Sequence, residues 1–170
     1  PVEQQRQRVE ALRSLEQQMR EAALLAGIDS EETGRAASYF QVDYSAIYER
    51  IQRRYQDQIE LMTVTEALKS YDWLRDYWWQ AVEVDQDKYT AAVELAQTGG
   101  FFLRVFAGQR VAEPIQACLL VQENNISQNV HNVILIEEGA AAQLITGCTL
   151  HPRVETGLHI GVTEVFLKKN

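Results

Sequence analysis

Cys148 is the residue whose surroundings in the sequence best suit chemistry. It lies in the segment ITGCTLHP, after Gly147 and before Thr149, where a strand is predicted to end. A cysteine beside a glycine at a strand end can be partly exposed, and the ionised thiolate is the form that attacks electrophiles and binds metals. Cys148 is therefore a candidate nucleophile or ligand.

The second cysteine, Cys118, lies in the apolar run IQACLLV. A cysteine in such a run is more often a small core residue than a ligand, so Cys118 is only a weak thiol candidate. Two cysteines fit free thiols in a reducing compartment better than a disulfide framework. The sequence therefore predicts a cytoplasmic protein.

His131 and His159 are weak candidates for metal ligands. Both lie in predicted strands, where interior or edge positions would explain them equally well. The sequence has no HxH, HxxxH, HExxH or CxxC motif, so the spacing gives no signature of a zinc site. The two histidines are 28 residues apart and the two cysteines 30. If the chain formed stacked coils of about that length, or half of it, the two members of each pair would lie one above the other.

Composition excludes two classes of partner. The net charge of −8 argues against binding to duplex DNA, which requires a basic face. No apolar run reaches the roughly 18 residues of a membrane span. The length of 170 residues fits one domain, with or without an attached helical segment.

The pattern changes near residue 98, which divides a helical region (1–98) from a β region (99–170). Apolar residues recur at steps of three and four over 2–26 and again over 45–60, and both patterns predict helices. Between them, a short helix followed by extended chain is predicted.

A further helix is predicted over 63–81, with Thr63 or Thr65 as its N-cap. It carries an aromatic cluster that consists of Trp73, Tyr77, Trp78 and Trp79. The cluster is expected to pack this helix against the β region. A patch for docking a partner is the alternative.

From residue 101 the chain consists of short segments rich in Val, Ile, Leu and Phe, punctuated by glycine. Several are continuous apolar runs, which are typical of strands buried on both faces in a parallel arrangement. No segment between them is long enough for a crossover helix, so the pattern favours a β-solenoid. An antiparallel sandwich or barrel remains the alternative.

Taken in order, several segments resemble the SufB/SufD family of iron–sulfur cluster assembly proteins. The similarity covers most of the chain and is strongest from Arg35 to Asn170. The matching segments are RAASYFQVD (35–43), ALKSYDWLRDYWW (67–79), DKY (87–89), GGFFLRVFAG (99–108), EPIQACLL (113–120), QNVHNVILIEEG (128–139) and ITGCT…GLHIGVTEVFLKK (145–169).

The resemblance implies an N-terminal helical region, a right-handed parallel β-helix core and a C-terminal helical domain. It also implies a cytosolic ABC-type ATPase, SufC, and a second SufB/SufD subunit as partners, with sulfur arriving as persulfide from a cysteine desulfurase. Cys148, in the Gly-Cys-Thr motif, matches a cysteine implicated in sulfur acceptance in the SufB branch. Cys118 matches a family position that carries no role to transfer.

The chain departs from the family pattern because the C-terminal half of a usual member is absent. We therefore expect a β-helix that is incomplete at its C-terminus, without the ATPase-docking helices and without a bound cluster of its own. The cluster would be held transiently by the full-length assembly. The last strand would then be an open edge, and self-association through it or through the first helix is expected.

The sequence thus predicts a scaffold component of iron–sulfur cluster assembly that is not an enzyme, with Cys148 as the persulfide acceptor. The SufB and SufD branches stay open. A purely structural interaction module is the alternative, and a cupin-like metal enzyme is a weaker one because the HxH pair is missing.

Overall fold

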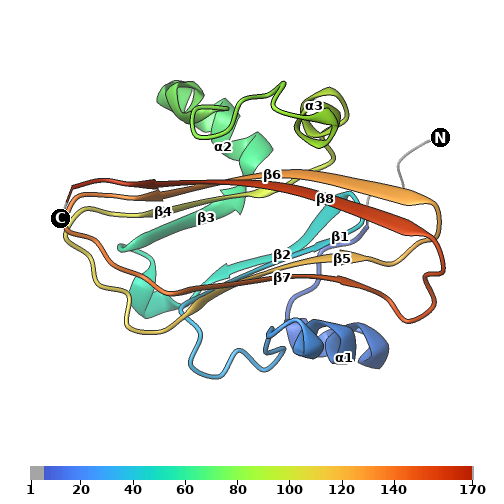
Figure 1. The fold of residues 1–170 in the computed structure, drawn as a ribbon. Coiled ribbons are helices and arrows are strands. Elements are labelled where there is room, and N and C mark those ends of the chain that lie inside the picture. The colour runs from blue at the N-terminus through green and yellow to red at the C-terminus, as the bar shows by residue number, and fades with distance from the viewer. Residues whose placement is uncertain (1–5, 170) are drawn as a thin grey trace.

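A computed structural model describes residues 6–169 as two four-stranded sheets stacked face to face, with helices on both outer sides (Figure 1). In sheet A the strand order is β2-β1-β5-β7. The β1–β2 pair is antiparallel and the other two pairs are parallel. Its strands are β1 (Ala37–Val42), β2 (Ser45–Ile51), β5 (Ile115–Val121) and β7 (Leu144–Leu150).

Sheet B repeats this arrangement with the order β3-β4-β6-β8. The β3–β4 pair is antiparallel, and β4–β6 and β6–β8 are parallel. Its strands are β3 (Ile59–Thr63), β4 (Phe101–Val105), β6 (Ile126–Ile136) and β8 (Gly157–Leu167). From β4 onward the chain therefore alternates between the two sheets.

Among residues 6–169, three apolar clusters hold the layers together. The largest lies between the sheets and includes Tyr39, Phe101 and Ile115. A second joins sheet A to α1 (Gln17–Leu25), and a third joins sheet B to α2 (Val64–Ser70) and to the 3-10 helix Asp72–Tyr77. The helix α3 (Lys88–Leu95) also contacts sheet B, and shorter 3-10 helices span Leu12–Ser14 and Arg53–Tyr55.

The predicted fold class, a helical region followed by a right-handed parallel β-helix, is wrong. The structure is an α/β arrangement of two mixed sheets, and residues 37–63 of the predicted helical region form three strands. Parallel strands without crossover helices are nevertheless confirmed for β4–β6, β5–β7 and β6–β8. A strand packed between a second sheet and a helix layer is apolar on both faces, so its sequence resembles that of a solenoid strand. The division at residue 98 stays a prediction.

The helix predictions succeed in part. Residues 17–25 of the predicted helix 2–26 are helical, but Leu25 of its apolar stripe is 92% exposed, and residues 2–5 lie outside the described residues. Over 45–60 the helix prediction is wrong, because the three-to-four spacing of aromatic and aliphatic residues falls on two strands and a 3-10 turn. The helix predicted near 31 is absent from the described residues.

The helix predicted over 63–81 begins where expected. The Thr63 hydroxyl caps α2 by accepting a hydrogen bond from the Glu66 backbone N–H at 3.2 Å. The chain then continues as a 3-10 helix after Ser70, and its aromatic rings face sheet B as predicted. Trp73 packs on Phe102 and Tyr77 on Phe166. Within residues 6–169, no helix combines the length and the apolar character of a membrane span.

Candidate functional site

Cys148 lies on β7, an edge strand of sheet A, and is exposed. Its register partner on β5 is Leu119, which belongs to the core between the two sheets. Register partners in a parallel pair project to the same face of the sheet. The thiol therefore projects to the inner side of sheet A, at an edge where Leu150, two residues along, is 48% exposed.

The glycine before this cysteine has a packing role. A Cβ on Gly147 would lie 2.5 Å from the carbonyl oxygen of Ala26, just after α1. Any side chain at this position would push the end of α1 away from β7, since 2.5 Å is far below a van der Waals contact. The Gly-Cys sequence thus allows α1 to pack on one face of β7 and leaves the thiol on the other.

Cys118 lies on the opposite face and is fully buried, as the core interpretation predicted. Its register partner is Gly147, and it packs in the cluster beneath α1. Burial raises the pKa of the Cys118 thiol well above its ordinary value. The two cysteines occupy neighbouring strands, as their spacing suggested, but their side chains do not face each other.

The two histidines predicted as weak metal ligands are not brought together. His131 and His159 face opposite sides of sheet B, because their register partners are Val162 and Gln128. His159 Nδ1 lies 2.8 Å from the side-chain oxygen of Gln128, and His131 is fully buried. Within the part of the chain that the structure describes, no three His, Cys, Asp or Glu side chains cluster as metal ligands would.

Glu164 is the partner that the sequence did not reveal. Its carboxylate lies 2.7 Å from His131 Nε2, and both side chains are shielded from solvent. It also accepts hydrogen bonds from three backbone N–H groups of the loop 79–82, and the Trp78 and Trp79 rings lie against the imidazole. In the sequence, Glu164 is one polar residue in an apolar strand, with no pattern to single it out.

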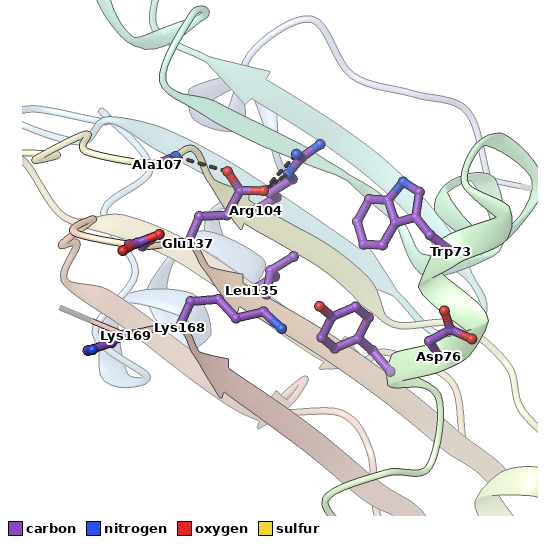
Figure 2. Close-up of a pocket in the computed structure, with 10 residues that line it drawn as sticks. Trp73, Asp76, Arg104, Ala107, Leu135, Glu137, Lys168 and Lys169 are labelled. Carbon is purple, nitrogen blue, oxygen red and sulfur yellow. Dashed lines mark hydrogen bonds and ion pairs between the residues drawn. The ribbon is translucent and has the colours of Figure 1, made fainter.

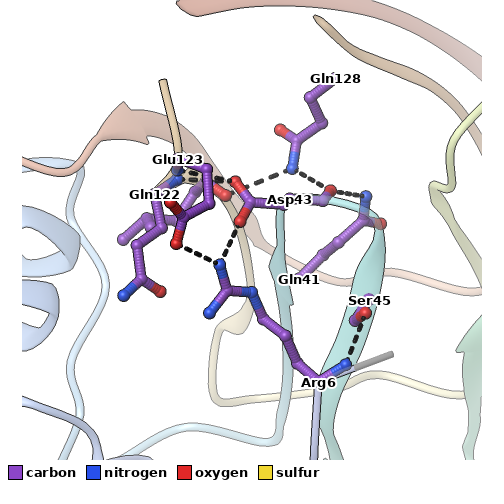
Figure 3. A network of polar contacts seen from close by, with 8 residues as sticks. Arg6, Gln41, Asp43, Ser45, Gln122, Glu123 and Gln128 are labelled. Carbon is purple, nitrogen blue, oxygen red and sulfur yellow. Dashed lines mark hydrogen bonds and ion pairs between the residues drawn. The ribbon is translucent and has the colours of Figure 1, made fainter. Parts of the chain in front are cut away.

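A second polar network joins the two sheets at Asp43, in the turn between β1 and β2 (Figure 3). Its carboxylate accepts hydrogen bonds from the Gln122 backbone N–H at 2.7 Å and from the Arg6 guanidinium. Its backbone oxygen accepts from the side-chain amides of Gln41 in sheet A and Gln128 in sheet B, at 2.9 and 2.7 Å. These contacts tie the turn after β1 to both sheets and so stabilise their packing.

The same joint includes Gly100, at the start of β4. Its N–H donates to Gln41 Oε1 at 3.1 Å, and its carbonyl accepts from the Tyr39 hydroxyl at 3.2 Å. Its φ of +121° and its approach to His131 require glycine, because a Cβ there would lie 2.1 Å from the His131 carbonyl oxygen. Three segments that are distant in sequence therefore meet here.

A groove of about 880 Å³ lies on the outer face of sheet B, between the 3-10 helix and the ends of β4, β6 and β8 (Figure 2). Arg104 forms ion pairs with Glu137 and Glu60, and its guanidinium lies 5.2 Å from the centre of the Trp73 ring. The Lys168 ammonium lies 4.5 Å from the centre of the Tyr77 ring. Arg104 and Glu137 are thus already paired with protein groups, and Lys168 lies over an aromatic ring.

No protein-family model matches the sequence. An iron–sulfur cluster assembly SufBD family protein of Methanothermobacter thermautotrophicus strain Delta H is 40% identical over 156 residues, 89% of this chain and 37% of the relative. One of the same name in Archaeoglobus fulgidus is 36% identical over 144 residues, 85% of this chain and 38% of the relative. The chain belongs to the SufBD family. The iron–sulfur cluster assembly protein SufB of Bacillus subtilis is 26% identical over 143 residues, 83% of this chain and 31% of that protein.

This SufBD chain spans less than two fifths of the length of these curated relatives. The segments on which the resemblance rested now have positions in the fold. Those around Gln41, Gly100 and His131 meet at the joint between the sheets, and the Gly-Cys-Thr segment lies in β7, where Cys148 is exposed between two partly buried neighbours. These segments thus include residues that hold the fold and one accessible thiol.

Proposed function

We propose that this SufBD chain is part of a cytoplasmic scaffold for iron–sulfur cluster assembly and that Cys148 accepts persulfide sulfur. Membership of the family supports the general role. The observation that carries the specific one is the exposure of Cys148 on the edge strand β7, opposite the buried Cys118. Sulfur transfer requires that a donor reach the thiol, and only Cys148 meets that requirement.

The proposed step is a thiol exchange. The Cys148 thiolate attacks the outer sulfur of a persulfide on a cysteine desulfurase. A new sulfur–sulfur bond forms at Cys148, the donor's sulfur–sulfur bond breaks, and the donor leaves as a thiolate, so no net oxidation or reduction occurs. In this proposal the chain holds sulfur for an assembly and does not itself act as an enzyme.

In the full-length protein, the partners would be a SufC-type ATPase and a second SufB/SufD subunit. The iron–sulfur cluster would be the cargo of that assembly rather than a resident cofactor of this chain. The family of the relatives supports both statements. They concern the whole protein, of which this chain represents a part.

Anaerobic sulfur transfer from a cysteine desulfurase tests the proposal. Mass spectrometry of the wild type, Cys148→Ser and Cys118→Ser would detect a gain of about 32 Da, one sulfur atom, for each persulfide formed. We expect the gain in the wild type and in Cys118→Ser, and none in Cys148→Ser. A folded wild type that gains no sulfur would contradict the proposal and favour a structural module without chemistry of its own.

A further inference from the structure

The loop at the end of the aromatic cluster, residues 78–82, is held to sheet B by a single buried carboxylate. Glu164 on β8 accepts hydrogen bonds from the backbone N–H groups of Trp79 at 2.8 Å, Ala81 at 2.6 Å and Val82 at 3.3 Å. The side chain of Glu164 is fully buried. No hydrogen bond between the loop and any other residue of the sheets is present in the described chain, so Glu164 is the polar anchor of residues 78–82.

His131 is the fourth donor to this carboxylate. In its carboxylate form Glu164 can only accept, so His131 donates to it from Nε2. The other ring nitrogen, Nδ1, is buried and has no hydrogen-bond partner among the described residues. His131 is thus a neutral imidazole that donates once.

The loop closes over this imidazole. The Trp78 and Trp79 ring centres lie 3.9 and 4.3 Å from the centre of the His131 ring. Trp79 has a φ of +55°, a left-handed conformation that a bulky residue adopts only when its surroundings impose it. Its indole N–H donates to Glu94 on α3, so the loop also connects to that helix.

A second proton on His131 would disturb this arrangement. It would place an N–H on Nδ1, where no acceptor lies, and a charge where water is excluded. Glu164 and Glu94 are the charged groups that bear on the ring, and both favour the protonated form. Burial outweighs them, so the pKa of His131 is lowered from its ordinary value.

We propose that His131 and Glu164 form a proton-sensitive latch that holds residues 78–82 on sheet B, and that protonation of His131 releases this loop. At neutral pH the neutral imidazole is the fourth donor to Glu164 and the loop is closed. As the pH falls, His131 becomes an imidazolium, which water stabilises more than the closed site does. The loop therefore opens and exposes the ring to solvent. Release also lets Trp79 leave its left-handed conformation.

The direction of the pH dependence follows from the lowered pKa. An opened, solvated His131 titrates near its ordinary value of about 6.5, and the closed one titrates below it. The closed state is therefore fully favoured above pH 6.5 and is progressively lost as the pH falls toward the closed-state pKa. Over that interval the opening constant rises by up to about tenfold per pH unit, because one proton is taken up on opening.

Hydrogen exchange of the 170-residue chain tests the latch. Protection factors, corrected for the intrinsic exchange rate at each pH, are measured for the amides of residues 79, 81 and 82 and for strands β4 and β6. Proton NMR of the imidazole follows the titration of His131. We expect loop protection to fall below pH 6.5 with the same midpoint as the His131 titration, while the strands stay protected.

Two variants isolate His131. In His131→Gln the side-chain amide still donates to Glu164 but does not titrate, so loop protection should be independent of pH from 7.5 to 5, about the interval in which histidines change charge. His159→Gln is the matched control on the same sheet, since burial also lowers its pKa and it does not contact the loop. It should keep the wild-type response.

Three results would overturn the latch. The first is loop protection that stays constant while the His131 ring titrates. The second is an identical pH response in the wild type and in His131→Gln. The third is a fall in strand protection parallel to that of the loop, which would mean global unfolding. The first and third need only the wild type and hold even where His131→Gln does not fold.

Discussion

β7 and β8 are the corresponding edge strands of sheets A and B, yet they present reactive side chains in opposite environments. On β8, Glu164 projects outward beneath a loop and accepts four hydrogen bonds. On β7, Cys148 projects inward at an edge and is exposed. The strands occupy equivalent places, but the two side chains project to different faces, one beneath a covering loop and one at an uncovered edge. That difference decides whether a side chain supports the fold or is available to a reagent.

This comparison assigns different consequences to substitution on the two strands. Changes beneath the loop on β8 should act on stability, because they leave buried donors without acceptors. Changes at the exposed position on β7 should act on reactivity and leave stability almost unaltered.

The largest effect is expected from Glu164→Ala. It removes the acceptor of three backbone N–H groups and of His131, all of them buried or partly buried. Several buried donors would lose their common acceptor, which should lower the free energy of unfolding by about 3–5 kcal/mol, measured by urea denaturation. Glu138→Ala, at an exposed position, is the control and should stay within about 0.5 kcal/mol of the wild type. Equal effects of the two would refute the structural role given to Glu164.

A smaller loss is expected from Gly100→Ala at the joint between the sheets. The added methyl would lie 2.1 Å from the His131 carbonyl oxygen, and the backbone is already at positive φ. Strain and displacement together should cost about 2–3 kcal/mol in denaturation experiments.

Gly34→Ala separates these two contributions. Gly34 also has a positive φ, +63°, but an added Cβ there has no neighbour within 4 Å. Its cost should be the conformational strain alone, about 1 kcal/mol. A cost at Gly100 no larger than that at Gly34 would show that the close approach to His131 is tolerated.

The sequence predicted the environment of individual residues better than it predicted the arrangement of the strands. Thr63 as a helix cap, the buried Cys118 and the packing of Trp73 and Tyr77 follow from local residue chemistry, and all are confirmed. Exposure of Cys148 agrees with its place beside a glycine. These predictions need only the properties of a residue and its neighbours.

The layout could not be predicted in the same way. Tyr48, Ile51, Tyr55 and Ile59 have helical spacing, but tertiary pairing with β1 and β4 makes this segment extended. A two-layer sheet with helices outside produces the same apolar runs as a solenoid, which misled the fold prediction. Glu164 and Asp43 acquire their roles from partners more than 30 residues away. Periodicity contains no information on such contacts.

The two cysteines provide a further contrast between buried and exposed positions. Cys118→Ser places a hydroxyl in the apolar cluster beneath α1, and should lower the free energy of unfolding by about 1–2 kcal/mol. Cys148→Ser should change it by less than about 0.5 kcal/mol. In the native wild type, a thiol reagent should modify one cysteine rapidly and the other only as the protein unfolds, so the number of fast-reacting thiols measures this directly. Two fast-reacting thiols would contradict the burial of Cys118.

The smallest effect on stability is expected at the edge of sheet B, where association should change instead. Val165 and Leu167 on β8 face the inner side of the sheet and are 50% and 73% exposed. An open strand edge with exposed apolar side chains invites pairing with a second copy, and an inserted lysine opposes it. Val165→Lys should therefore weaken self-association about tenfold, which corresponds to roughly 1.4 kcal/mol.

Light scattering at increasing concentration measures this, and Leu25→Lys distinguishes the two predicted routes. Leu25 is 92% exposed at the end of α1, on the outer side of sheet A, so a lysine there blocks association through the first helix and leaves β8 unchanged. If Leu25→Lys weakens association and Val165→Lys does not, the helix is the contact surface. A wild type that stays monomeric at high micromolar concentration would contradict both routes, and the apolar edge of β8 would then be tolerated in water without a partner.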